Sequence, residues 1–127
     1  MRKAALITLI VICSASIEAA TPAWTVGSQP TTASYTPPAT RTFNPANGPV
    51  TITRSQAGLY LVRFGGLAPL VTGGNGNVQV SPMSTLSGQC SVAGFNSSGT
   101  DVVITIRCYI TPGAHADVPF SLLFTYK

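Results

Sequence analysis

The segment from Gly88 to Thr111, GQCSVAGFNSSGTDVVITIRCYIT, alternates in hydropathy over its second half. The even-numbered positions from Val102 to Ile110 are all apolar, whereas the odd-numbered positions from Asp101 to Tyr109 are mixed. A period of two residues with many β-branched side chains is typical of a half-buried β-strand. The pattern therefore predicts a strand that turns Ile106 toward a core and Tyr109 toward solvent.

A second run, Cys90 to Phe95, precedes this strand, and the turn-forming residues NSSGT separate the two. A hairpin turn centred on Gly99 places Cys90 directly opposite Cys108. Opposed residues of an antiparallel pair have Cβ atoms about 4.5–5.5 Å apart, close to the separation that a disulfide spans. The register therefore predicts a cross-strand disulfide. A bulge near the turn would shift the register by one residue, and two buried free thiols are the alternative.

Residues 1–19 have the three parts of a secretory signal peptide. Arg2 and Lys3 supply the positive charge, Ala4 to Ile12 is an apolar run, and Ile17 to Ala19 offers a cleavage site before Ala20. The apolar run is shorter than the roughly 20 residues that span a bilayer. We therefore expect a secreted protein, extracellular or periplasmic, that has no membrane span after cleavage.

The mature chain carries little charge. It keeps five basic and two acidic side chains, a net charge of +3 with His115 neutral, and an even number of cysteines, which suits an exported disulfide protein. Only 8% of the full chain is charged, against a typical ~25%. Such a surface gives little electrostatic steering, which argues against nucleic acid as a partner.

The rest of the chain shows short strands separated by Gly/Pro turns, and no helical period. Residues 20–39 are rich in Thr, Pro, Ser and Ala and are predicted to form an extended leader or linker. Residues 40–127 are predicted to form one all-β domain, an antiparallel β-sandwich of about seven to eight short strands. Its predicted core consists of Ile52, Tyr60, Val62, Phe64, Val78, Val80, Val92, Ile104, Ile106, Phe120, Leu122 and Phe124.

The order of these segments resembles a known domain pattern. The successive stretches are YTPPATRTFNPANGPVTITRSQAGLYLVRFGGL, GNVQVSP, GQCSVAGF and VVITIRCYITPGAHADVPFSLLFTYK. They are similar to a largely uncharacterised repeat-like domain of secreted bacterial proteins, over about Tyr35 to Tyr126. The resemblance implies export and a β-sandwich, and it carries no catalytic residue to this chain.

Groups able to do chemistry are few in the mature chain. Paired-carboxylate catalysis would need Asp101 and Asp117 together, and a catalytic triad would need His115 with one of them. No serine lies in a nucleophile-elbow context. His115 and Asp117 could supply only two metal ligands, whereas a structural zinc site takes four. We therefore predict no enzyme activity, no cofactor and no metal.

Two functional interpretations remain. The first is a non-catalytic surface or protein-interaction module that presents the Gly65–Gly76 and Ala114–Pro119 loops. The second is a carbohydrate-binding module that stacks sugars on exposed aromatic side chains, with Trp24, Tyr35 and Tyr109 as candidates. Trp24 has the alternative role of capping the core, and no strand carries two outward aromatic residues two positions apart. The expected partner is an unknown protein or glycan at the cell surface.

Overall fold

The computed structural model describes residues 20–84, 87–111 and 113–127. The predicted signal peptide, residues 1–19, lies outside the described residues. Single 3₁₀ turns cover Ala39–Arg41, Ala68–Leu70 and Thr72–Gly74, and the described chain contains no α-helix. No helix in these ranges has the length and hydropathy needed to cross a membrane.

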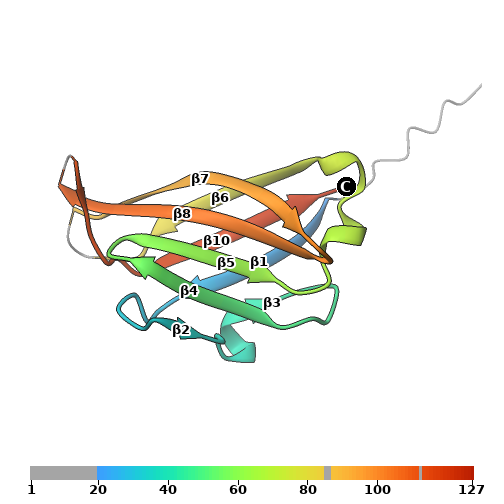
Figure 1. Ribbon diagram of the computed structural model, residues 1–127, viewed down its shortest axis with the longest axis horizontal. Coiled ribbons are helices and arrows are strands. Elements are labelled where there is room, and N and C mark those ends of the chain that lie inside the picture. Colours follow the sequence, from blue (N-terminus) through green and yellow to red (C-terminus); the bar gives the residue numbers. More distant parts are fainter. Residues whose placement is uncertain (1–19, 85–86, 112) are drawn as a thin grey trace, which may run out of the picture.

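Two antiparallel sheets lie face to face, with the six-stranded sheet in front in Figure 1. The four-stranded sheet is, in order, β3 (Thr42–Phe43), β1 (Thr21–Gly27), β10 (Phe120–Tyr126) and β6 (Gly76–Pro82). The six-stranded sheet is, in order, β2 (Ser34–Tyr35), β4 (Val50–Gln56), β5 (Leu59–Phe64), β8 (Asp101–Thr111) and β7 (Gln89–Ser98), with β9 (Ala114–His115) also paired to β8. The predicted antiparallel all-β sandwich is confirmed.

The core lies between the sheets and is built from the alternate residues of each strand. Nine of the twelve predicted core residues are buried, and the other three, Val78, Val80 and Val92, are half-buried. These three lie on β6 and β7, the last strand of each sheet, where neighbouring strands cover one side only. Leu67 and Val118, which come from loops, complete the core.

The β7–β8 hairpin pairs Cys90 with Cys108, and the two form a disulfide. The turn is centred between Gly99 and Thr100 and not on Gly99, because Ser98 pairs with Asp101. Gly99 has a φ of +63°, which suits the first position of a two-residue hairpin loop. A bulge at Ala93 then adds one residue to β7 and restores the predicted register at the cysteines.

The prediction of a leader over residues 20–39 is wrong for Thr21–Gly27. This segment is β1, paired with β10 on one side and with β3 on the other. Its inward residues are small because large rings already fill the space. A Cβ at Gly27 would lie 2.6 Å from the Phe120 ring, and Ala23 lies opposite Phe124. Because an inward face of Ala, Thr and Gly gives no alternation in hydropathy, the sequence pattern does not predict this strand.

Two positions of β8 also differ from the alternation. Val103, expected to face solvent, is 8% exposed, and Ile110, expected to face the core, is 39% exposed. Tyr109 faces outward as predicted but is half-buried because β9 lies beside it. Ile110 lies between Tyr109 and Thr111, at the irregularity in the pairing of β8 with β9, where the alternation of the strand is interrupted.

Candidate functional site

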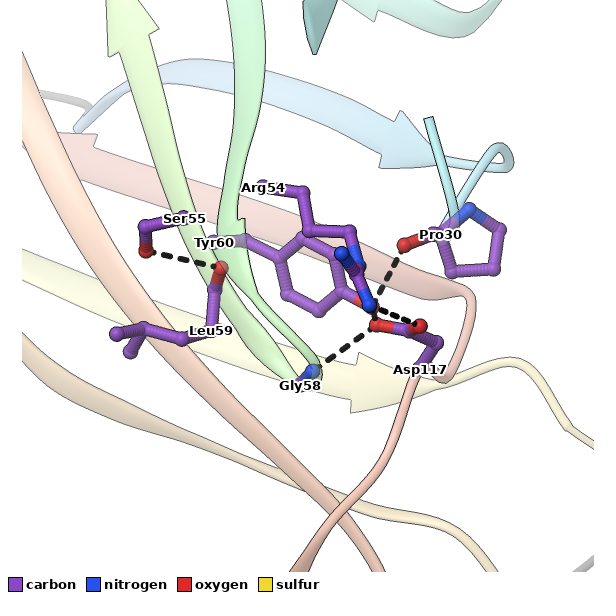
Figure 2. A network of polar contacts seen from close by, with 7 residues as sticks. All are labelled: Pro30, Arg54, Ser55, Gly58, Leu59, Tyr60 and Asp117. Carbon is purple, nitrogen blue, oxygen red and sulfur yellow. Dashed lines mark hydrogen bonds and ion pairs between the residues drawn. The ribbon is translucent and has the colours of Figure 1, made fainter. Parts of the chain in front are cut away.

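The most connected polar group is Asp117, in the loop before β10 (Figure 2). Arg54 donates from Nε to Oδ1 at 2.9 Å and from its terminal nitrogen to Oδ2 at 2.8 Å. The backbone N–H of Gly58 donates to Oδ1 at 2.9 Å. The Tyr60 hydroxyl lies 3.0 Å from the same oxygen and 3.1 Å from the Pro30 carbonyl oxygen. The carboxylate thus contacts β4, β5 and the turn between them, and the Tyr60 hydroxyl links this cluster to the loop that follows β1.

The ionisation of this cluster follows from its contacts. The guanidinium of Arg54, assisted by the Gly58 N–H and the Tyr60 hydroxyl, lowers the pKa of Asp117 to about 2. Burial, together with the hydrogen bond to Asp117, raises the pKa of Tyr60. Both oxygens of the carboxylate already accept structural donors. Asp117 is therefore held as an anion, and it connects the loop before β10 to β4 and β5.

The second acid, Asp101, lies at the opposite end of β5. Its carboxylate accepts from Arg63 at 2.9 Å and from the backbone N–H of Gly66 at 3.0 Å. Gly58 precedes β5 and Gly66 follows it, so this six-residue strand, about 20 Å long, separates the two acids. Paired-carboxylate catalysis requires a separation of about 5 Å or 6.5–9.5 Å, so these two acids cannot form such a pair.

The candidate aromatic residues do not come together. Tyr35 lies on β2, packs against the core and accepts a hydrogen bond from the Gln29 N–H at 3.2 Å. Tyr109 lies on β8, with its ring centroid 4.7 Å from that of His115. Trp24 lies on β1, in the other sheet. Tyr35 and Tyr109 are occupied by contacts of their own, and Trp24 remains the strongest candidate.

Trp24 belongs to a row of side chains that crosses the four-stranded sheet on its outer face. The register pairs Trp24 with Phe43 on one side and with Leu123 on the other, and Leu123 with Gln79. Directly paired residues of antiparallel strands project from the same face. Because Ala23 and Thr25 are buried, Trp24 and its partners project outward. Phe43 is 46% exposed and Leu123 is 36% exposed.

A second row runs beside the first, from Val26 through Ser121 to Ser81. An open groove of about 330 Å³ lies over the two rows and is lined by Trp24, Thr25, Val26, Gln79, Ser81, Ser121, Leu122 and Leu123. The first row is apolar up to Leu123 and ends in the amide of Gln79, and the second row carries hydroxyl groups next to Val26. The outward residues of β1, β3, β6 and β10 include no charged side chain before Lys127. We call this surface the groove face.

The groove face was only partly visible in the sequence. The sequence identifies Trp24 as a candidate, but aromatic residues two positions apart on one strand are the only platform that a sequence pattern can reveal. Phe43, Trp24 and Leu123 lie on three strands that are far apart in the chain, and only the pairing of β3, β1 and β10 brings them into one row. The sequence offers one signal for this surface, because the period-two alternation leaves Phe43, Trp24 and Leu123 outside the predicted core.

Comparisons with protein-family models, with curated proteins and with solved structures found no match to this chain. Within the described ranges, no three His, Cys, Asp or Glu residues cluster closely enough to hold a metal ion. The groove face is thus the candidate site, and its chemistry is that of contact and hydrogen bonding.

Proposed function

We propose that the protein is a secreted, non-catalytic β-sandwich module that binds at a cell surface through its groove face. The outward row of Phe43, Trp24 and Leu123, in which Phe43 and Leu123 are exposed and Trp24 is half-buried, is the observation that carries this proposal. Aromatic side chains are enriched where proteins bind partners, and this row places two of them, Phe43 and Trp24, on the outer face of the sheet.

The sandwich supports the proposal because it holds this row rigid. β1 and β10 are the two central strands of their sheet, so Trp24 and Leu123 project from backbone that is paired on both sides. A rigid aromatic surface loses little conformational entropy on binding. Secretion is supported by the pattern of residues 1–19 and by the Cys90–Cys108 bond, because disulfides persist in oxidising compartments.

The absence of catalysis is proposed from the state of the acids. Asp101 and Asp117 are each engaged by an arginine and by a backbone N–H, and they lie at opposite ends of β5. His115 contacts Tyr109 on β8 and is not hydrogen-bonded to either acid in the contacts described above. The contacts of Asp101 and Asp117 therefore have a structural role in holding the loops. Binding is the role that we propose for the groove face.

The test is the binding of the purified exported protein to intact cells of the producing organism. We expect saturable binding that weakens at least tenfold in Trp24→Ser and in Phe43→Ser, since truncated anchor residues dominate interface energies. The matched control is Leu61→Ser, because Leu61 is 37% exposed on the outer face of the other sheet. Circular dichroism verifies that each variant is folded. Equal binding by all variants, or no saturable binding by the unaltered protein, would overturn the proposal.

A further inference from the structure

We propose that the groove face binds an uncharged polysaccharide whose chain lies across the strands, an inference that rests on the proposed function. The two rows under the groove differ in chemistry. Trp24 and Leu123 form the apolar part of one row, which ends in the Gln79 amide, and Ser121 and Ser81 stand in the other row beyond Val26. A sugar ring has the matching pair of surfaces, an apolar C–H face and a rim of hydroxyl groups. One ring can therefore cover the indole and bond to the serines at once.

The direction of the groove indicates a chain. Its lining residues come from β1, β10 and β6, which are neighbours in the sheet, so the groove crosses the strands. Neighbouring strands lie about 4.8 Å apart, which makes the groove about 10 Å long. Phe43 on β3 extends the apolar row beyond one end of the groove. A compact ligand would leave Phe43 unused, whereas a linear polymer continues over it.

The charges of the molecule indicate that this polymer is neutral. Arg63 and Asp101 pair with each other on the six-stranded sheet, and Arg54 pairs with Asp117. The residues that line the groove offer hydroxyl, amide and apolar groups only, and the exposed Arg41 is not among them, although it lies directly before β3. A carboxylate or sulfate held there would lose water without gaining a cationic partner, which is costly. The groove therefore selects against acidic polysaccharides, although the mature chain is positively charged overall.

A protein partner fits the same face less well. The apolar core of a protein interface would cover Trp24 and Leu123 but would leave the hydroxyl and amide groups of Ser81, Ser121 and Gln79 without partners. Buried polar groups that lose their hydrogen bonds weaken association. A polyol supplies hydrogen-bond donors and acceptors along its whole length, so it can bond to these groups at any position along the chain. Binding of a protein, or of a second copy of this chain, is an outcome that the test distinguishes.

The test uses polysaccharide extracted from the surface of the producing cells and separated by anion exchange into neutral and acidic fractions. Affinity electrophoresis of the exported protein in each fraction measures binding. We expect the neutral fraction to bind at least ten times more tightly than the acidic fraction. Trp24→Ser should weaken that binding at least tenfold, Ser121→Val should weaken it about threefold to tenfold, and Leu61→Ser should leave it unchanged.

Several results would overturn this inference. These are preferential binding of the acidic fraction, no binding of the neutral fraction, concentration-dependent dimers that Trp24→Ser abolishes, and cell binding that protease treatment of the cells removes while periodate oxidation does not. If binding to cells still depends on Trp24 in those cases, the proposed function stands and only the ligand class is wrong. If binding to cells does not depend on Trp24, both proposals fail.

Discussion

Asp117 connects the loop before β10 to the β4–β5 hairpin. Its partners, Arg54, Gly58 and Tyr60, come from a hairpin more than fifty positions earlier in the chain, and side-chain exposure of the ion pair is 29% for Arg54 and 18% for Asp117. Removing one member of a partly buried pair leaves the other charge poorly solvated. The stability that such a pair supplies depends on the ionisation of its acid.

We expect Asp117→Asn to lower the free energy of unfolding by about 2 kcal/mol at pH 7. The pKa of Asp117 is about 2 in the folded protein, below its unfolded value near 3.9. The carboxylate therefore stabilises the fold above the unfolded pKa, and this contribution is lost as the pH falls from about 5 through 2. Urea unfolding at pH 7, 5, 3 and 2 should show the difference between the two proteins shrinking toward acid pH.

Asp101→Asn is the matched control for that measurement. Asp101 also has a lowered pKa, caused first by the Gly66 N–H and then by Arg63, but its ion pair is more exposed, with Arg63 at 46%. Exposed pairs contribute little to stability, so this variant should lose less stability than Asp117→Asn. A difference for Asp117→Asn that stays constant between pH 7 and pH 2 would contradict the ionic origin of its effect.

At the scale of elements, the β7–β8 hairpin has the predicted register at the cysteines because two one-residue shifts, one at the turn and one at a bulge, cancel. The prediction placed the turn on Gly99, whereas the turn has two central residues, and the bulge at Ala93 shifts β7 back by one. Hydropathy alternation cannot locate a bulge in a run such as Val92 to Phe95. The pairing of the cysteines could be predicted from the pattern of β8, and the path of β7 toward them could not.

The bulge predicts different results for two single-residue deletions. Ala93 has no partner on β8, so its deletion should preserve the Cys90–Cys108 bond and change the melting temperature little. Deleting Ser91 forces a choice, because either Cys90 moves opposite Arg107 or Val92 turns outward with Ala93 in its place. That variant should be destabilised by at least about 1 kcal/mol, or roughly 4–8 °C. Thiol titration and thermal melts measure both effects, and free thiols after deletion of Ala93 would contradict this register.

Reduction of the disulfide gives a second prediction for the same hairpin. The bond joins residues 18 apart, and by the chain-entropy relation a loop of this size stabilises by about 3 kcal/mol. Reductant should therefore lower the melting temperature by about 10–20 °C without unfolding the protein at room temperature, because the core between the sheets remains. Thermal melts followed by circular dichroism, with and without reductant, provide the measurement. An unchanged melting temperature would show that the bond contributes nothing to the folded state.

At the scale of the whole molecule, the sandwich and most of its core follow from period-two patterns in β5, β8 and β10. The four-stranded sheet was harder to predict, because the small inward residues of β1, such as Ala23 and Gly27, are complementary to rings from β10. The groove face is hard to predict for the same reason. It exists only where β3, β1, β10 and β6 are paired in this order, and strand order was not deducible from the chain.

The most direct test of the groove face uses Trp24, the one tryptophan of the sequence. Its emission reports on this surface alone, so acrylamide quenching can be measured for the purified protein by itself and at saturation with the neutral polysaccharide fraction. We predict that the quenching constant falls at least twofold on binding, because the occupant covers the indole. An unchanged quenching constant at a saturation established by affinity electrophoresis would contradict it and place the contact elsewhere on the molecule.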